Sequence, residues 1–500
     1  GTVLPEIQPS LGWRSGEQAM GTCSKLACGM ASAALAACSF TPDVPTSTVA
    51  TAPIAQSEFV TASIAPVSPE APDTLWWRLY DDPELDGYIT KALSENNSLK
   101  AAFANLDRVL AALGESRSAY LPSTDINAGA TYERDAAQQA TQKANTEDLS
   151  YTSGFSLSYE IDLFGRVRNS VAAARADAQA AESALHASRI TIAAETARAY
   201  ADICSANQQI SVTENTLNLQ TRTVDLTRQL TEGGQGTKLD IVRAQVNVEN
   251  TKASLPQLKA DRENARFRLA TLVGQPPAAM VDAAADCSRA PIVAATIPVG
   301  DGAGLIARRP DVREAENALK AAAARVGVAT AELYPQISLA GSIDTTALQI
   351  ASLKEDGAVS FSFGPLISWT FPNIWAGRAR IAAAEAGMAQ ALAEFDQAVL
   401  VALEETETAL QNYAAELERQ SALTLARDAA AQSARMAQSR YELGADDFIT
   451  VLDAERTLAD ADITLAQSQA NTTQFQIGLF RALGGGWGDG PAEMGKSAGL

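Results

Sequence analysis

Gly165-Arg166-Val167-Arg168 and Gly377-Arg378-Ala379-Arg380 are the two stretches that decide the fold of this 500-residue chain, because they occupy equivalent places in an internal repeat. Residues 120–274 run strand, strand, long helix, glycine turn, long helix, and residues 333–484 repeat that order. An internal repeat of this size has to be recognised before any fold is assigned. We therefore interpret the chain as one elongated unit built from two similar halves, called copy one and copy two below.

Four stretches alternate apolar and polar residues with a period of two, which is typical of strands with one apolar face. A soluble sheet has the same alternation, but strands of about ten residues with aromatic residues near their ends also match outer-membrane barrels. Four strands cannot close a barrel, since roughly eight are needed, and lipid does not tolerate an open sheet edge. If the strands lie in a membrane, the protein must oligomerise, and three protomers would give twelve strands. The strands are expected at about 124–133, 152–163, 336–344 and 359–371.

Each strand pair is followed by a helix that is too long for an ordinary globular domain. The first long helix contains neither proline nor glycine, and the second contains only Gly387. About 66 residues at a rise of 1.5 Å give a rod of roughly 100 Å. Apolar residues at heptad spacing, such as Ile203, Ile210 and Leu217, predict side-by-side packing of the coiled-coil kind. The helices are expected at about 166–231, 237–273, 378–443 and 448–483, after an earlier helix pattern that runs to about residue 119.

The first 37 residues are interpreted as a signal and upstream segment, with Met20 as a plausible translation start. Leu35-Ala36-Ala37-Cys38 has the pattern of a bacterial lipobox, which would make Cys38 the acylated first residue of the mature chain. The alternative is a plain secretory signal with a chance cysteine. The following residues, 38–74, are rich in Pro, Ser, Thr and Ala and predict an extended tether.

The composition disfavours several classes of function. A net charge of −20 without a basic stripe argues against nucleic acid as a partner. No run of 18 apolar residues follows the N-terminal segment, so no transmembrane helix is expected. His186 is the single histidine, and no carboxylate pair has catalytic spacing, so neither an enzyme nor a metal or cofactor site is expected. Whether Cys204 and Cys287 pair is left open.

Several short motifs accompany this order of elements: Trp76-Trp77, Asp82-Pro83-Glu84-Leu85, Arg308-Arg309-Pro310-Asp311-Val312, Tyr334-Pro335 and Ala482-Leu483-Gly484-Gly485-Gly486-Trp487. With these motifs, the chain resembles the outer-membrane efflux channels related to TolC, and more narrowly the lipoprotein members of the NodT type. The resemblance covers about residues 38–488. It implies a mostly α-helical homotrimer with a twelve-stranded membrane barrel, a periplasmic tunnel of helical hairpins and a mixed α/β equatorial belt. It also implies docking to a periplasmic adaptor and an inner-membrane RND-type transporter.

Together these patterns divide the chain into six parts. They are a signal and upstream segment (1–37), a lipidated tether (38–74), a first repeat (75–274), an equatorial linker (275–309), a second repeat (310–484) and a C-terminal tail (485–500).

The resemblance places the closing end of the tunnel at the turns between long and return helices, where the family carries aspartates. Asp453 and Asp240 match such positions and are expected to line a periplasmic gate. The alternative is that both are helix-start charges, which the helix dipole favours. Arg243 is the copy-one counterpart of Asp453, and Thr450 stands where relatives have a second acid. The turns are expected to contact the adaptor, although a tight reversal also needs glycine; their residues are Gly233, Gly234, Gly236, Gly444, Asp446 and Asp447.

The leading hypothesis is a passive exit duct in the outer membrane of a Gram-negative bacterium, which conducts small toxic compounds while an inner-membrane pump supplies the energy. One alternative is the exit duct of a type I protein secretion system. A second is a periplasmic coiled-coil scaffold, in which the four strands would form an ordinary sheet. The exported compounds cannot be identified from the chain, because selection is expected in the pump.

Overall fold

The computed structural model describes residues 42–134, 147–234, 236–280, 283–371 and 373–485. Cys38, the expected signal segment and the tail after residue 485 lie outside these residues. Two compact units divide the chain. The first contains Gly114–Ala173 and Ala322–Gly387, and the second contains Val44–Leu113, Ala174–Ala321 and Met388–Leu500.

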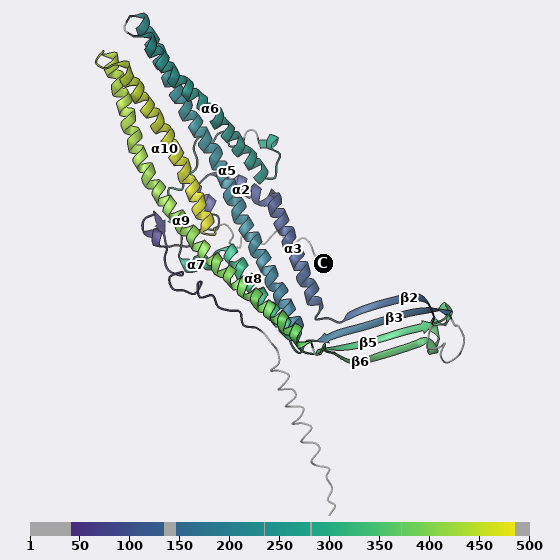
Figure 1. Ribbon diagram of the computed structural model, residues 1–500. Coiled ribbons are helices and arrows are strands. Elements are labelled where there is room, and N and C mark those ends of the chain that lie inside the picture. Colours follow the sequence, from purple (N-terminus) through teal and green to yellow (C-terminus); the bar gives the residue numbers. More distant parts are fainter. Residues whose placement is uncertain (1–41, 135–146, 235, 281–282, 372, 486–500) are drawn as a thin grey trace, which may run out of the picture. The chain divides into compact units, whose positions relative to one another are not determined.

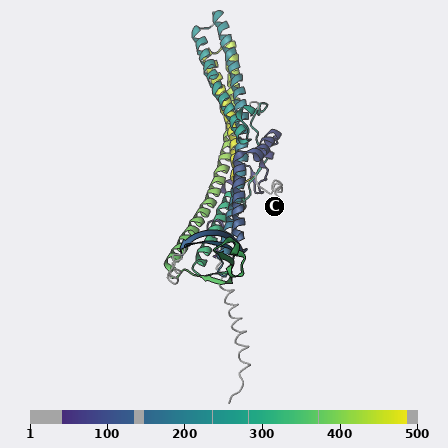
Figure 2. The same ribbon diagram turned by 90° about the vertical axis from the view of Figure 1, so that its right-hand side faces the viewer.

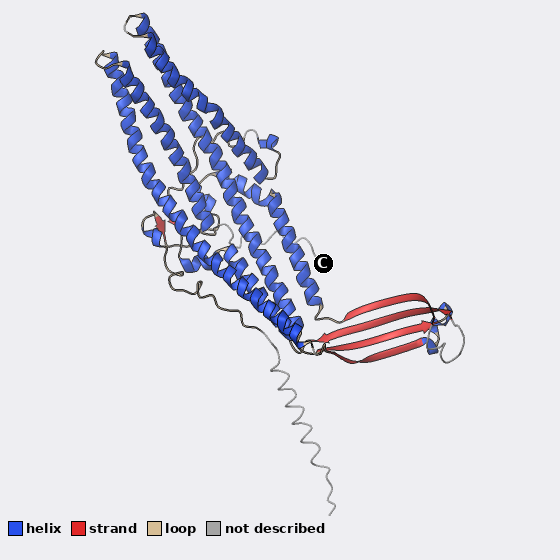
Figure 3. Cartoon of the chain, in the orientation of Figure 1, coloured by secondary structure: helices blue, strands red, loops and turns tan. Residues whose placement is uncertain are grey.

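The first unit holds a four-stranded antiparallel sheet with the strand order β2-β3-β5-β6 (Figure 3). Each copy supplies two neighbouring strands, and β3 of copy one pairs with β5 of copy two. The sequence places the end of the last strand near residue 371, but β6 ends at Ser368, because Ser368 pairs with the first residue of β5, Gln336. The strands are β2 (Ser123–Arg134), β3 (Glu147–Ile161), β5 (Gln336–Ala347) and β6 (Val359–Ser368).

The register of this sheet aligns apolar residues in a row across all four strands. The row consists of Ile126, Phe155, Ile343 and Phe361, which are 80%, 41%, 55% and 82% exposed. The neighbouring row across the four strands is polar and consists of Asp125, Ser156, Ser342 and Ser362. Successive side chains of a strand point to opposite faces, so the sheet has one apolar and one polar face. Large apolar side chains therefore remain exposed in the single chain.

Two antiparallel helix pairs form the largest part of the structure (Figures 1 and 2). The first pair is α5 (Arg166–Glu232) with α6 (Lys238–Leu272), and the second is α9 (Ile374–Glu442) with α10 (Phe448–Ala482). The 67 residues of α5 span about 100 Å at 1.5 Å per residue. None of the described helices is both long and apolar enough to cross a membrane.

The two strand-to-helix junctions differ in local structure despite their equivalent sequences. In copy one, Gly165 has a φ of +84° and directly precedes α5. In copy two, α9 already begins at Ile374, so Gly377 lies inside the helix. A Cβ atom at Gly377 would stand 2.2 Å from Leu333 Cδ2, so this glycine allows a close approach rather than a turn.

The helix pattern before the first strand is two helices rather than one. α2 (Pro83–Glu95) and α3 (Asn97–Ser118) are separated at Asn96, whose backbone is extended with a ψ of 126°. The Asn96 side chain accepts a hydrogen bond from the backbone N–H of Leu99 at 3.1 Å and so caps α3. The apolar periodicity continues across this break, which is why the sequence pattern does not reveal it.

Short elements surround the helix pairs of the second unit. Trp76 stacks on Phe480 of α10 with 4.9 Å between ring centroids, and both side chains are fully buried. β1 (Val67–Ser68) pairs in parallel with β4 (Ile297–Pro298), which joins the N-terminal segment to the linker between the copies. The other short elements of this unit are η1 (Val60–Ser63), η2 (Trp76–Tyr80), η3 (Pro277–Met280) and α7 (Gly302–Arg308). The helix α8 (Pro310–Ala331) runs from the second unit into the first, which also holds η4 (Ile350–Lys354) and η5 (Asp356–Ala358).

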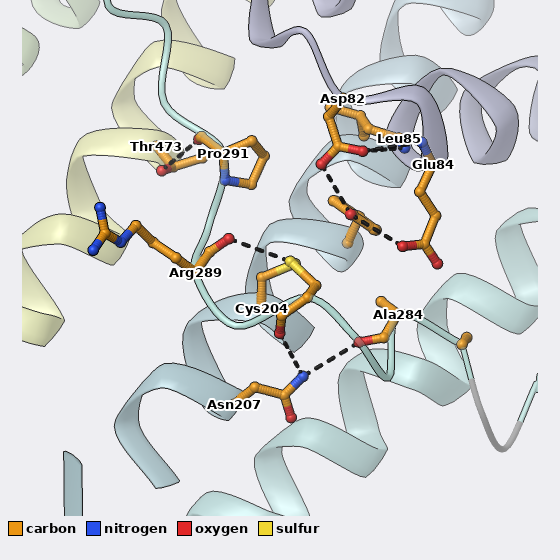
Figure 4. Close-up of a disulfide and its surroundings, with 12 residues drawn as sticks. Asp82, Glu84, Leu85, Cys204, Asn207, Ala284, Arg289, Pro291 and Thr473 are labelled. Atoms are coloured by element: carbon orange, nitrogen blue, oxygen red, sulfur yellow. Dashed lines mark hydrogen bonds between the residues drawn. A yellow bond between two sulfur atoms is a disulfide. The ribbon is translucent and has the colours of Figure 1, made fainter. Parts of the chain in front are cut away.

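A disulfide ties the linker to copy one, which answers the question that the sequence leaves open. Cys204 of α5 is bonded to Cys287 of the linker (Figure 4). Asn207 Nδ2 donates to the carbonyl of Cys287 at 2.8 Å, and Thr473 Oγ1 of α10 donates to the carbonyl of Pro291 at 3.0 Å. The linker is thus fixed to a helix of each copy. Disulfides persist in oxidising compartments, which agrees with an exported protein.

Candidate functional site

The tips of the two helix pairs, where each long helix turns into its return helix, pack against each other. A small apolar cluster joins them, with Val224 from α5, Ala244 from α6, and Phe448 and Leu452 from α10. Tyr441 of α9 packs against this cluster, and its ring centroid lies 5.5 Å from that of Phe448. The expected site residues of both copies therefore belong to one packed end of the second unit.

The copy-one tip is a glycine turn whose backbone needs small residues. Gly234 has a φ of +81°, which favours glycine, and its N–H donates to the carbonyl of Thr231 at 3.1 Å. A Cβ atom at Gly236 would stand 2.7 Å from Thr231 Oγ1. Gly233 is exposed and donates to the carbonyl of Gln229 at 3.0 Å. The reversal itself thus accounts for Gly234 and Gly236.

Asp240 takes part in a capping box at the start of α6. Its backbone N–H donates to Thr237 Oγ1 at 3.3 Å, while its Oδ2 accepts from the backbone N–H and the hydroxyl of Thr237 at 3.0 and 2.6 Å. This arrangement satisfies donors at the helix start. The carboxylate that the sequence places in a gate is therefore engaged in holding the helix start.

The copy-two tip is held by two aspartates. Arg440 of α9 donates from Nε and Nη2 to the two carboxylate oxygens of Asp446, at 2.7 and 2.8 Å, and this hydrogen-bonded charge lowers the pKa of Asp446. Asp447 is the N-cap of α10 and accepts from the backbone N–H and the hydroxyl of Thr450 at 3.2 and 2.8 Å. Gly444 has a φ of +72° at the reversal. Asp446 and Asp447 thus have structural partners, and Asp447 remains exposed.

Asp453 lies three residues after Thr450 in α10, and its side chain is exposed. Among the described residues, its carboxylate has neither a hydrogen-bond nor an ion-pair partner, while its backbone carbonyl accepts from Thr457 Oγ1 at 2.7 Å. Its copy-one counterpart Arg243 is exposed in the same way. Among the described residues, neither charge is therefore part of a side-chain hydrogen bond or an ion pair.

A buried carboxyl group that the sequence analysis did not single out links the two copies below the tips. Glu455 of α10 is 5% exposed, and its Oε1 accepts from the hydroxyl of Thr223 on α5 at 2.6 Å. Its Oε2 is buried without a partner in the part of the chain that the structure describes. Burial raises the pKa of Glu455. The only sequence signal is its place in the repeated pairs Ala244-Gln245 and Ala454-Glu455.

Tyr441 is the second residue that the sequence analysis missed at the tips. Burial, followed by the negative charge of Asp240 on α6, raises the pKa of the Tyr441 hydroxyl. The influence of Asp240 on a side chain of α9 again places the two tips close together. Within the described ranges, no group of three metal-ligating side chains is gathered anywhere.

The sequence and the fold are similar to those of known outer-membrane proteins. The family model described as "Outer membrane efflux protein" matches residues 88–275 and 304–485. Outer membrane protein OprJ of Pseudomonas aeruginosa is 31% identical over 460 residues, which cover 91% of this chain and 94% of OprJ. Nodulation protein T of Rhizobium leguminosarum bv. trifolii is 28% identical over 418 residues, which cover 82% of this chain and 88% of nodulation protein T. The solved outer-membrane channel OprN superimposes with a TM-score of 0.83 at 34% identity, over 90% of this chain and 100% of OprN.

Proposed function

The chain belongs to the outer membrane efflux protein family, and from this premise we propose that it is the exit duct of a tripartite efflux system. It is an outer-membrane channel protein of a transport family. The duct conducts small toxic compounds passively from the periplasm to the exterior. A periplasmic adaptor connects it to an inner-membrane RND-type transporter, which supplies the energy.

The exposed apolar row on an open four-stranded sheet is the observation that carries this proposal. In the described sheet, β2 and β6 each pair with a strand on one side only. An unpaired backbone edge costs several kcal/mol per group in lipid, and roughly eight strands are needed to close a barrel. A homotrimer would supply twelve strands and cover every edge. The apolar row would then face lipid.

We propose Asp453 as the carboxylate that lines the closing end of the tunnel. Three copies of an unpaired carboxylate near one axis would concentrate negative potential, attract cations and slow anions. Asp240 was expected to share this role. Its place in the capping box supports the helix-start role instead, with any effect on ions secondary.

The exposed turns of the tips are proposed to contact the adaptor. Gly233, Gly234, Gly444 and Asp447 are exposed, and Gly236 and Asp446 are partly exposed. The Arg440–Asp446 pair and the two helix caps give these turns defined shapes, which a docking partner could recognise.

We further propose that the chain is anchored by a lipid on Cys38, on the basis of the Leu35-Ala36-Ala37-Cys38 pattern. A lipid anchor on one residue is weak and scales with the buried methylene groups. Cys38→Ala should therefore leave the protein in the outer membrane through its sheet, while labelling with radioactive palmitate is lost.

Deletion and complementation in the source bacterium test the proposed function. Deletion should increase sensitivity to a panel of antibiotics, dyes and detergents, and the intact chain should restore resistance. Unchanged sensitivity to every compound, together with loss of a secreted protein from the medium, would favour the type I secretion duct instead. Extraction tests the scaffold alternative: the duct requires detergent and runs as a heat-labile trimer, whereas a scaffold would be released in buffer.

A further inference from the structure

A hollow of about 380 Å³ in the second unit lies between α5, α9 and α10. Its wall combines two arginines, Arg198 and Arg481, with the amide of Asn412, the hydroxyl of Thr408 and the ring of Phe475. A volume of this size is in the range of small-molecule sites, which pair an apolar wall with a few polar groups. None of these residues belongs to the tip site described above.

On α5 and α10, residues of the hollow lie on the sides of the helices that face away from the linker and the N-terminal segment, whereas on α9 Glu405 of its wall is bound to Arg309. On α5, the hydroxyl of Tyr200 donates to Asp82 at 2.9 Å, and Asn207 binds the linker (Figure 4). Arg198 is two residues from Tyr200, which is about 200° around a helix. On α10, Phe480 stacks on Trp76, and Gly478 of the hollow is again two residues away. If these helices form the proposed tunnel with the covering segments outside it, Arg198 and Gly478 of the hollow lie on its inner side.

Arg198 is partly buried and Arg481 is exposed, and both have N–H donors available to a ligand in the hollow. Arg198 Nε is buried without an acceptor among the described residues. The closest carboxylate to Arg198 is that of Glu195, at 4.0 Å, and Glu195 is itself the partner of Arg268. Arg481 makes no ion pair within the described part of the chain. Burial, followed by the neighbouring positive charge of Arg481, lowers the pKa of Arg198, while the charge of Asp202 acts in the opposite direction.

The acidic side chains near the hollow are mostly engaged elsewhere, although the charge of Asp202 also acts on Arg198. Glu405 is bound to Arg309 at 2.7 Å. Asp202 accepts from Gln474 Nε2 at 2.6 Å. Glu404 lines the hollow, but within the described ranges it makes no ion pair with either arginine. Guanidinium groups bind carboxylates through paired N–H donors, so a carboxylate placed between these two arginines would find suitable partners.

We propose that this hollow binds small organic carboxylates between Arg198 and Arg481, with the apolar part of the ligand against Phe475. The site is a stopping point for anionic compounds on the tunnel wall, and its place in the conduction path rests on the proposed function. Binding itself does not depend on conduction. The site would offset the unfavourable effect of a chain with a net charge of −20 on anionic cargo.

Binding to the purified full-length protein in detergent tests the proposal directly. The probes are 1-naphthoate and its neutral amide, 1-naphthamide, followed by fluorescence titration. The wild type should bind naphthoate about tenfold tighter than naphthamide, and Arg198→Gln/Arg481→Gln should remove that preference. Arg456→Gln removes the same charge from an exposed position elsewhere on α10 and should leave binding within about twofold.

Two further variants keep the test independent of folding. Arg198→Lys and Arg481→Lys retain the charge but lose the paired donors, so each should weaken naphthoate binding partially while the heat-labile oligomer stays intact. Equal naphthoate affinity of the wild type and the double Gln variant would overturn the proposal. The proposal would also be overturned if the wild type binds no naphthoate while the oligomer of the double Gln variant dissociates at a lower temperature than that of the wild type. That result would mean that an acidic side chain of a second copy fills the hollow and pairs with the arginines.

Planar bilayers separate this inference from the proposed function. Naphthoate should reduce the current through the wild-type channel and have a weaker effect on the double Gln variant. Normal conduction without naphthoate binding would reject only the carboxylate site. Naphthoate binding to a protein that never conducts would keep the site and reject the duct.

Discussion

The return helices of the two copies begin with the same two side chains in opposite order. In copy one, Thr237 is the N-cap and Asp240 is the third helical residue, whereas in copy two Asp447 is the N-cap and Thr450 is the third. The hydroxyl-to-carboxylate distances are 2.6 and 2.8 Å. Both arrangements satisfy backbone donors at a helix start, so one carboxylate in each helix cap serves the fold.

The copies differ in charge three residues after Asp240 and Thr450, where copy one has Arg243 and copy two has Asp453 at the equivalent position of the repeat. Both side chains are exposed, and among the described residues neither makes a side-chain hydrogen bond or ion pair. The aspartates that shape the tips thus differ from Asp453 in having partners. If Asp453 lines the gate as proposed, the gate carboxylate comes from copy two, and a trimer would present three such groups rather than six.

The largest expected effect concerns the Cys204–Cys287 disulfide, which ties the linker to copy one. Copy two cannot form such a bond, because the sequence has no cysteine after residue 287. The disulfide encloses a separation of 83 residues, for which the chain-entropy model gives about 4 to 5 kcal/mol. Cys204→Ser/Cys287→Ser should therefore lower the thermal unfolding midpoint clearly. Reductant should lower the midpoint of the wild type to the same extent and leave that of the variant unchanged. Equal midpoints in all four conditions would show that the tie contributes nothing.

The Thr223–Glu455 link between the copies should respond to pH. Because burial raises the pKa of Glu455 in the folded protein, the folded state binds this proton more tightly than the unfolded state. The protonated Glu455 carboxyl therefore contributes to stability at low pH, and this contribution is lost as the pH rises from the ordinary glutamate pKa through the raised value. Glu455→Gln should stabilise the protein at pH 7, and the gain should vanish below about pH 4.

Glu455→Ala provides the matched loss at the same position. It leaves the Thr223 hydroxyl without its acceptor and should cost about 1 to 3 kcal/mol. Thermal melts from pH 4 to 8 measure both variants. A pH-independent difference between Glu455→Gln and the wild type would contradict the link as described.

The reversed caps give a smaller and more specific effect. Thr237→Ala and Asp447→Ala should each cost about 1 kcal/mol. The double change Thr237→Asp/Asp240→Thr gives copy one the order of copy two and should stay within about 0.5 kcal/mol of the wild type. A swap as damaging as Thr237→Ala would mean that the two tips are not equivalent as helix starts.

The Arg440–Asp446 pair should have the smallest effect. Both side chains are at the surface, where ion pairs contribute little and are screened by salt. Arg440→Ala should move the unfolding midpoint less than Asp447→Ala, and added salt should reduce the difference further. A larger loss than that of the cap variant would assign the pair a structural role beyond the turn.

Much of this architecture could be predicted from the sequence because periodicity is a local property. The four strands, the two long helix pairs and the glycine turns follow from spacing alone. Contacts between distant residues could not be read in this way. The pairing of Cys204 with Cys287, the link from Thr223 to Glu455 and the meeting of Arg198 with Arg481 depend on how the helices pack. The break at Asn96 was hidden because the apolar pattern continues through it.

At the candidate site, the sequence located the tips but could not separate the roles of their acids. Asp240 and Asp453 both stand near a helix start, and only the partners of their carboxylates distinguish them.

Ion selectivity of the reconstituted channel tests the central claim most directly. Reversal potentials in a potassium chloride gradient should show that the wild type prefers cations and that Asp453→Asn reduces this preference several-fold. Asp240→Asn should change it little, while Arg243→Asp should increase it. The account is contradicted if Asp240→Asn lowers cation preference as much as Asp453→Asn, or if Asp453→Asn leaves it unchanged.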